Sequence, residues 1–142
     1  MARLTIERKI MALTQLETAL RLYFEGSDHF SVITLAGAAD EVFGQLLAAQ
    51  GTCNSLEQIK KATSAIHLKL FGKELDPSWV AQRANHARNS LKHWAPGQPL
   101  AVIFDPVEEA KDMLNRAVDN YWALEHSLSP AMERFQRGYM AA

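Results

Sequence analysis

Cysteine and the common catalytic signatures are scarce in this sequence. Cys53 is the only cysteine among 142 residues, so the chain can form neither an internal disulfide nor a cysteine-based metal cluster. There is no Gly-rich phosphate loop, and no serine or cysteine has the neighbours expected of a nucleophile. The familiar nucleotide-binding loops and hydrolase triads are therefore excluded as explanations of function.

Long hydrophobic runs are also missing. No segment approaches the roughly 20 consecutive apolar residues that a membrane span needs. The first 20 residues interleave charged side chains at positions 3, 7, 8, 9 and 17 with apolar ones, whereas a signal peptide has an unbroken apolar centre. We therefore expect a cytoplasmic protein that does not associate with membranes.

The chain has little net charge, but that charge is unevenly distributed. The formal net charge is −1. Residues 60–93 carry seven Lys and Arg against two acidic residues, a net charge of +5, and the other residues carry eight against 14, a net charge of −6. A polyanionic partner would meet the basic third of the chain. An unevenly charged solvated surface explains the same pattern equally well.

Helical periodicity is the dominant positive signal. A length of 142 residues with 48% hydrophobic and 22% charged residues is typical of one globular domain, here residues 1–142. The periodicity and its Gly and Pro punctuation predict helices over 3–25, 30–50, 55–71, 77–94 and 105–125, an extended segment at 100–104, and a short helix from 130. We expect an all-α fold, an antiparallel up-and-down four-helix bundle with short additional helices.

Short signals mark several helix starts. Ser55 and Gln58 form a capping box, and Asp76 followed by Pro77 supplies an N-cap and a first-turn proline. The small residues AGAA at 36–39 leave room for another helix backbone to approach closely.

The predicted helix over residues 77–94 has two distinct faces. At 3.6 residues per turn, its apolar stripe consists of Val80, Ala84, Ala87, Leu91 and Trp94. The opposite stripe consists of Gln82, Asn85, His86, Asn89 and His93. A face that only meets water more often carries Glu and Lys. Amides and histidines favour a wet interface or a site that hydrogen-bonds a ligand.

The stretch RNSLKH, residues 88–93, contains the side chains needed to handle phosphate. Arg88 offers a planar fork that stays charged, and His93 offers an imidazole, the group best suited to proton transfer near neutral pH. Lys92 adds positive charge, and Asn89, one turn before His93, is placed to orient its ring. Arg88 and His93 lie about 140° apart on an ideal helix. They converge only if the helix unwinds near His93 or if a second subunit completes the site.

An Arg followed four to six residues later by His, often with Asn directly after the Arg, resembles the signature of the HEPN family, the higher eukaryote and prokaryote nucleotide-binding domains. The resemblance includes the helical architecture over residues 30–125. It implies a metal-independent endoribonuclease without cofactors, a homodimer in which both motif copies face one cleft. Arg88 and His93 would then promote attack of a ribose 2′-hydroxyl on the adjacent phosphate, with Asn89, Lys92 and His86 in support.

The resemblance also implies candidate partners. Several family members are toxins that pair with a small nucleotidyltransferase antitoxin, and others have lost catalysis and serve as nucleotide-binding or interaction modules. We therefore expect RNA or a nucleotide, a second copy of the chain, and a nucleotidyltransferase antitoxin as partners. The alternative to a ribonuclease is a non-catalytic, dimeric helical module that binds a nucleotide or another protein.

A metal site is the first competing interpretation. No Glu is followed three residues later by His, so the Glu-x-x-His ligands of di-iron helical bundles are absent. Asp40 and Glu41 are the carboxylates that can in principle meet His86 or His93, but a solvated acidic patch explains them better. We expect no metal.

Base stacking by aromatic residues is the second competing interpretation. Trp79, Trp94, Trp122 and Tyr121 are of the kind that stack on bases in single-strand binders. Their helical spacing favours core packing or subunit contact instead.

Overall fold

The computed structural model describes residues 2–141. Within them lie seven helices: α1 (Arg8–Glu25), α2 (His29–Ala49), α3 (Ser55–Phe71), α4 (Pro77–Ala84), α5 (His86–Lys92), α6 (Pro106–Glu125) and α7 (Pro130–Ala141). These residues contain no strand, and 74% of them are helical, so the all-α bundle prediction is confirmed.

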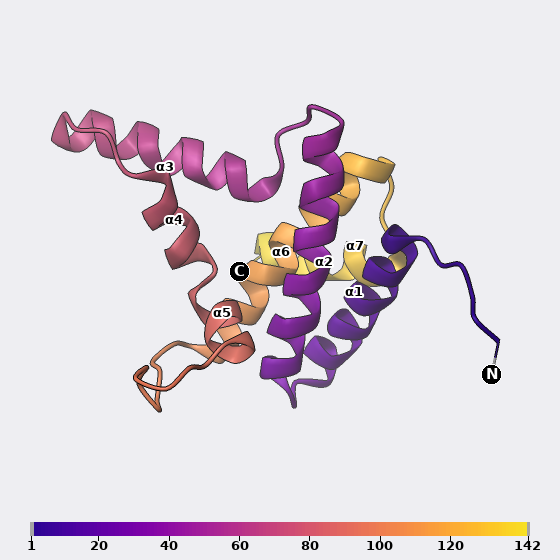
Figure 1. Ribbon diagram of the computed structural model, residues 1–142. Helices are drawn as coiled ribbons and strands as arrows, with labels where there is room; N and C mark the ends of the chain where they lie inside the picture. The colour runs from indigo at the N-terminus through magenta and orange to yellow at the C-terminus, as the bar shows by residue number, and fades with distance from the viewer. Residues whose placement is uncertain (1, 142) are drawn as a thin grey trace.

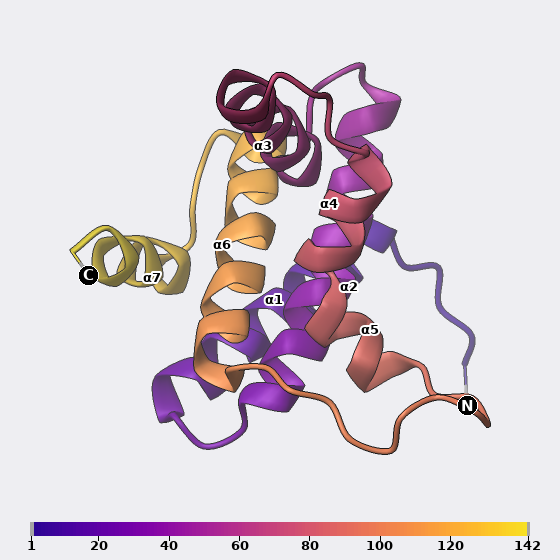
Figure 2. The same ribbon diagram turned by 90° about the vertical axis from the view of Figure 1, so that its left-hand side faces the viewer.

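The helix α2 lies at the centre of the bundle. It packs against α1 on one side and α6 on the other, as Figures 1 and 2 show. The largest apolar side chains buried in this core are Leu16, Leu20, Ile33, Phe43, Met113, Leu114, Met132 and Phe135. The last two come from α7, which packs against α1 and α6. Since burial of each such side chain contributes about 1.5–3 kcal/mol, the packing of α2 against α1 and α6 is the main stabilising element.

The same helix α2 is the most apolar of the fold. By length and composition it could cross a membrane, and no other helix in residues 2–141 could. However, 50% of its most apolar stretch is buried inside the fold, as in the core helix of a globular protein. The sequence analysis did not identify α2 as long and apolar enough to span a membrane, because Asp40 and Glu41 interrupt its apolar run.

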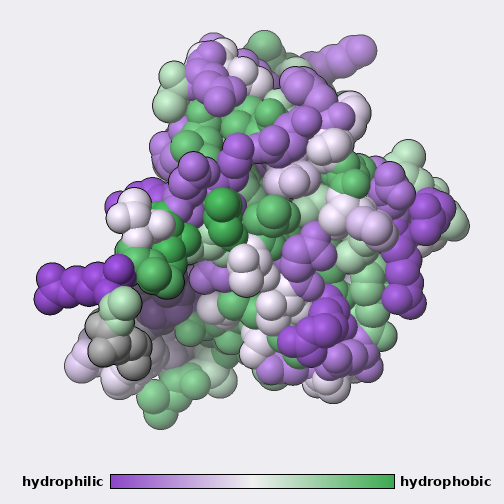
Figure 3. Space-filling model, turned by 90° about the vertical axis from the view of Figure 1, so that its right-hand side faces the viewer, coloured by the Kyte–Doolittle hydropathy of each residue, from purple (hydrophilic) through white to green (hydrophobic). Residues whose placement is uncertain are grey.

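The start of α1 differs from the prediction. The helix begins at Arg8 rather than at residue 3, and the preceding residues run away from the bundle (Figure 1). Ile6 follows the helical period but finds no core to cover it and is 50% exposed, and the preceding Leu4 is 77% exposed. On this side of the molecule, Figure 3 shows hydrophobic atoms only in patches separated by hydrophilic side chains.

The capping box predicted for α3 is also wrong. Asn54, not Ser55, is the N-cap, and its Oδ1 accepts a hydrogen bond from the Glu57 N–H at 2.9 Å. Ser55 is the first helical residue, and its buried N–H donates to Oδ1 of Asn120 on α6 at 2.8 Å. Asn54 rather than Ser55 is the N-cap because this long-range bond holds Ser55 inside the helix. A local sequence motif does not contain that information. Asp76 and Pro77 start α4 as predicted.

The predicted helix over 77–94 is broken into α4 and α5 at Asn85. In a continuous helix the Ala84 carbonyl would accept from the N–H of Arg88. Here it accepts from Nη1 of Arg116 on α6 at 3.1 Å, and the same nitrogen donates to Oδ1 of Asn85 at 2.8 Å. A buried guanidinium must fill its hydrogen bonds, and the helix opens to supply two of them.

This break changes which residues form the core. Val80 and Ala87 are buried as predicted, but Leu91 and Trp94 are 38% and 59% exposed. Asn85, assigned to the polar outer stripe, is buried. The stripe assignment assumed a constant helical phase, and that phase is lost at residue 85.

Candidate active site

Three of the five predicted site residues share one open groove. The groove has a volume of about 790 Å³ and lies between α4, α5 and the segment that follows α5. It is lined by Gln82, His86, Asn89, Ser90, His93, Trp94, Gln98, Pro99, Leu100 and Val102. We call it the histidine groove. Its polar wall carries two imidazoles and three amides, and its other wall is apolar, a combination suited to a planar polar ligand.

His93 stands where α5 ends. Its backbone is extended, with φ −131° and ψ 131°, and its N–H donates to the Asn89 carbonyl at 2.9 Å. The helix therefore unwinds at His93, which is one of the two conditions under which Arg88 and His93 were expected to converge. The His93 ring is exposed and forms no hydrogen bond within residues 2–141. Asn89 contacts His93 through its backbone carbonyl, not through the side-chain amide predicted to orient the ring.

Arg88 does not line the histidine groove. Its Nη1 donates to Oε2 of Glu41 on α2 at 3.1 Å, and its side chain is only 16% exposed. The aliphatic stem of Arg88 lies against Gly37, where the small residue at the centre of AGAA leaves space for it. The buried Nε of Arg88 has no partner within residues 2–141. Unwinding at His93 thus fails to bring both motif residues to one groove within a single copy.

The other two predicted residues flank these positions. Lys92 is exposed at the end of α5 and forms no ion pair within residues 2–141. His86 lines the histidine groove and also a neighbouring depression that contains Glu109 of α6. Partial burial raises the pKa of Glu109, repulsion from Asp112 raises it further, and His86 lowers it. Sequence reasoning missed Glu109 because an acidic residue in the first turn of a helix is ordinary.

A buried polar network fixes the helix break behind the groove. Nη2 of Arg116 donates to Oδ2 of Asp40 at 2.6 Å, and the amide of Asn120 donates to Oδ1 of Asp40 at 3.1 Å. Burial raises the pKa of Asp40, and the charge of Arg116 opposes this shift. Because Arg116 also holds Asn85, the network joins α2, α6 and the junction between α4 and α5. It therefore positions the residues that enter the groove.

The acidic pair on α2 does not meet a histidine, and the expected solvated patch holds only for Glu41, whose side chain is 56% exposed. Asp40 is 4% exposed and bonded to Arg116, while Glu41 is paired with Arg88. Within residues 2–141, no group of three or more His, Cys, Asp and Glu side chains is arranged to hold a metal ion.

The tryptophans are not core residues. Trp79, Trp94 and Trp122 are 49%, 59% and 49% exposed, so the core-packing interpretation is wrong for all three. Tyr121 is half-buried and packs against Phe43 in the core, with ring centroids 5.5 Å apart. Of the three tryptophans, Trp94 lines the histidine groove.

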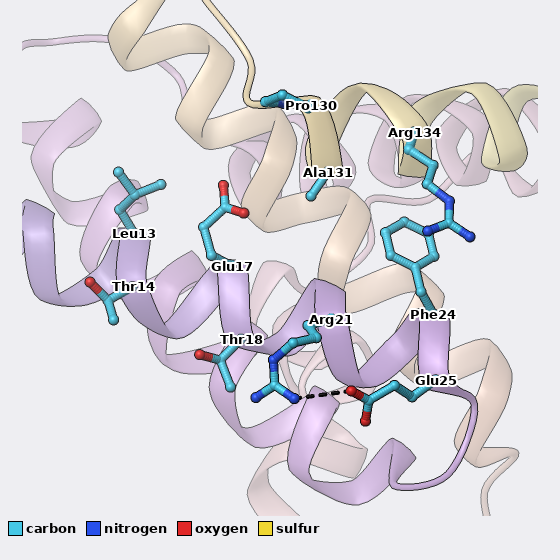
Figure 4. Close-up of a pocket in the computed structure, with 10 residues that line it drawn as sticks. All are labelled: Leu13, Thr14, Glu17, Thr18, Arg21, Phe24, Glu25, Pro130, Ala131 and Arg134. Carbon is cyan, nitrogen blue, oxygen red and sulfur yellow. Dashed lines mark hydrogen bonds and ion pairs between the residues drawn. The ribbon is translucent and has the colours of Figure 1, made fainter.

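A more voluminous depression than the histidine groove lies between α1 and α7. It measures about 1020 Å³ and is drawn in Figure 4. Three of its charged groups are engaged: Arg21 pairs with Glu25 at 3.0 Å, and the Arg134 guanidinium lies over the Phe24 ring at 3.9 Å. It is lined by no histidine or cysteine. The histidine groove is smaller but carries two imidazoles, the side chains best suited to proton transfer near neutral pH.

Comparisons with known proteins assign no family. No family model matches the chain. The chain is similar to a class 1 fructose-1,6-bisphosphatase from Methylorubrum populi, with 37% identity over 67 residues that cover 47% of this chain. It spans only 19% of the length of that relative. No solved structure matches. Function must therefore be argued from the groove and its surroundings.

Proposed function

We propose that the protein is a metal-independent endoribonuclease of HEPN type that works as a homodimer in the cytoplasm. The observation that carries the proposal is the histidine groove, where His86 and Asn89 of α5 and His93 at its end are exposed. Arg88 and Lys92 add positive charge at the same helix. Because Arg88 does not line the groove of its own copy, the active site takes Arg88 from one copy and His93 from the other.

The chemistry is a transesterification that needs no metal. The ribose 2′-oxygen bonds to the adjacent phosphorus, the bond from phosphorus to the 5′-oxygen breaks, and the products carry a 2′,3′-cyclic phosphate and a 5′-hydroxyl. An imidazole takes the 2′-hydroxyl proton, and a protonated group supplies one to the departing 5′-oxygen. Arg88 stabilises the negative charge that develops on the phosphate oxygens.

The direct test is cleavage of single-stranded RNA in the presence of EDTA. We expect fragments with 2′,3′-cyclic phosphate ends and no dependence on added divalent cations. Intact RNA at high protein concentration, or fragments with 3′-hydroxyl ends, would contradict the proposal. The nucleotidyltransferase antitoxin remains a prediction, and co-purification with a neighbouring gene product would test it.

The exposed wall of the groove predicts a role for Trp94 in holding a base. Stacking on an aromatic ring contributes about 1–3 kcal/mol per base, so Trp94→Ala is expected to raise KM for RNA about 5- to 100-fold with a smaller change in kcat. The matched control is Trp79→Ala, which removes an equally exposed indole outside the groove. An equal rise in KM for both variants would show that Trp94 has no special role.

The contact between α2 and α5 predicts the effect of Gly37→Ala. A Cβ on Gly37 would lie 2.6 Å from Cδ and 2.9 Å from Cγ of Arg88, so the Arg88 side chain must move. Alanine favours a helix by about 1 kcal/mol over glycine, which offsets the lost contact. We expect nearly unchanged stability but at least about tenfold slower cleavage, because a misplaced group loses its catalytic effect.

Gly138→Ala on α7 is the control for that variant, since a Cβ there would meet no atom within 4 Å. It should raise stability by up to about 1 kcal/mol and leave cleavage close to wild type. If Gly37→Ala cleaves RNA at the wild-type rate, the observed position of Arg88 is not needed for the reaction.

A non-catalytic interaction module is the second candidate. The ion pair between Arg88 and Glu41 favours it, because a guanidinium held by a carboxylate is partly neutralised. A module of this kind would bind RNA or a nucleotide without cleaving it, and the binding would not change in His93→Ala. The cleavage assay distinguishes the two functions.

A further inference from the structure

The helix α3 is the least buried long helix of the fold. Its 17 residues include one buried residue, Ser55, and no buried apolar side chain. Together with α4 it forms an arm, residues 55–84, that projects from the bundle in Figure 1. Helices of this length owe most of their stability to packing of an apolar face. Because α3 has no such packing within this copy, a partner surface is expected to cover it.

The uncovered side of the arm is apolar. Ala62, Ile66 and Leu70 follow one another at four-residue intervals and are exposed, whereas Thr63 and His67 are half-buried. Ile66, Leu70 and Phe71 are 60%, 69% and 67% exposed. Side chains four residues apart share one helix face, so these residues make a continuous apolar stripe. Stripes of this kind mark interaction sites.

Positive charge surrounds the stripe. Lys61, Lys69 and Lys73 lie on α3 or just after it and form no ion pair within residues 2–141. The partner that covers the stripe should therefore present apolar side chains with acidic neighbours.

The chain itself has such a surface on α6 and α7. Asp112, Asp119 and Trp122 lie on one side of α6 at helical spacing and are exposed. Tyr139 of α7 is near both carboxylates, since they raise its pKa together with partial burial. Met140 is 82% exposed. We call these five residues the acidic face. Burial raises the pKa of Asp119, and burial with repulsion from Glu108 raises that of Asp112, so a nearby cation would be favourable.

We propose that the arm docks on the acidic face of a second copy of this chain, so that Ile66, Leu70 and Phe71 cover Trp122 and Met140. Lys69 and Lys73 then lie opposite Asp112 and Asp119. The net charge of +5 on residues 60–93 and of −6 on the rest makes the chain complementary to itself. Two reciprocal contacts of this kind give a closed dimer with two-fold symmetry. This proposal does not depend on ribonuclease activity.

Sedimentation velocity over a range of concentrations tests the apolar part. Ile66→Glu with Leu70→Glu should weaken self-association by about 30-fold or more, while circular dichroism shows an unchanged helix content. Ile103→Glu, at a residue 95% exposed outside the arm, is the matched control and should associate like wild type. A wild-type chain that stays monomeric at high concentration would overturn the proposal.

A charge exchange tests which surface receives the arm. Lys69→Glu with Lys73→Glu should weaken association, Asp112→Lys with Asp119→Lys should do the same, and the quadruple variant should recover much of it. If the acidic-face variant associates like wild type while the arm variant does not, the arms pair with each other and the proposal is wrong. A dimer that follows these rules but cleaves no RNA would leave this inference intact and refute only the ribonuclease.

Discussion

His93→Ala is expected to lower the rate of RNA cleavage about 10²- to 10⁴-fold, the usual effect of removing a general acid or base. The ring is exposed and forms no hydrogen bond within residues 2–141, so its loss should not unfold the protein. The thermal midpoint should therefore stay close to wild type. A large loss of activity with unchanged stability separates a catalytic side chain from a structural one.

The matched control is His126→Asn. His126 ends α6 with a left-handed φ of 54°, a conformation that asparagine accepts, and it lies outside the histidine groove. This variant should cleave RNA like wild type. If His93→Ala retains full activity under conditions where EDTA has removed metals, a contaminating nuclease accounts for the cleavage.

Arg116→Ala is expected to have the largest effect on stability, about 3–5 kcal/mol. Removing this side chain leaves Asp40, at 4% exposure, without its cation and leaves Asn85 and the Ala84 carbonyl without their donor. Uncompensated buried charge is the costly part of the change. Urea unfolding measures the free energy, with Arg137→Ala at an exposed position as the control, expected within about 0.5 kcal/mol of wild type.

A double variant separates loss of the ion pair from loss of volume. Asp40→Leu with Arg116→Met removes both charges and keeps apolar bulk, so it should be much more stable than Arg116→Ala. Its histidine groove should nevertheless be less ordered, because the break at Asn85 no longer has its donor. A cost below about 1 kcal/mol for Arg116→Ala would be that of a surface ion pair, and it would contradict the role given to the network.

The parts of the fold encoded locally could be predicted from the sequence. Helical periodicity gave the all-α class, and the caps at Asp76 and Gly72 are where the residue types place them. The break at Asn85 could not be predicted, because its cause is Arg116, 31 residues away along the chain. A guanidinium in an amphipathic helix is usually solvated, and nothing in the local sequence indicates that this one is buried.

The candidate site was also predicted only in part. His86, Asn89 and His93 were assigned to one polar stripe, and all three line one groove. These residues stay on one side because His86 and Asn89 lie in α5, beyond the break, and His93 directly follows its last residue. The position of Arg88 depends on Glu41, 47 residues earlier, and on the absence of a side chain at Gly37. Spacing within the motif contains neither fact, so it did not reveal that Arg88 and His93 face different surfaces.

The central claim is that the site takes Arg88 from one copy and His93 from another. Mixing the inactive variants Arg88→Ala and His93→Ala, after their chains have exchanged, tests it most directly. Half of the dimers are then mixed, and each mixed dimer has one site with both side chains, so activity should recover to about a quarter of wild type. If the mixture cleaves RNA no faster than either variant alone, both residues act within one chain or not at all, and the composite site is refuted.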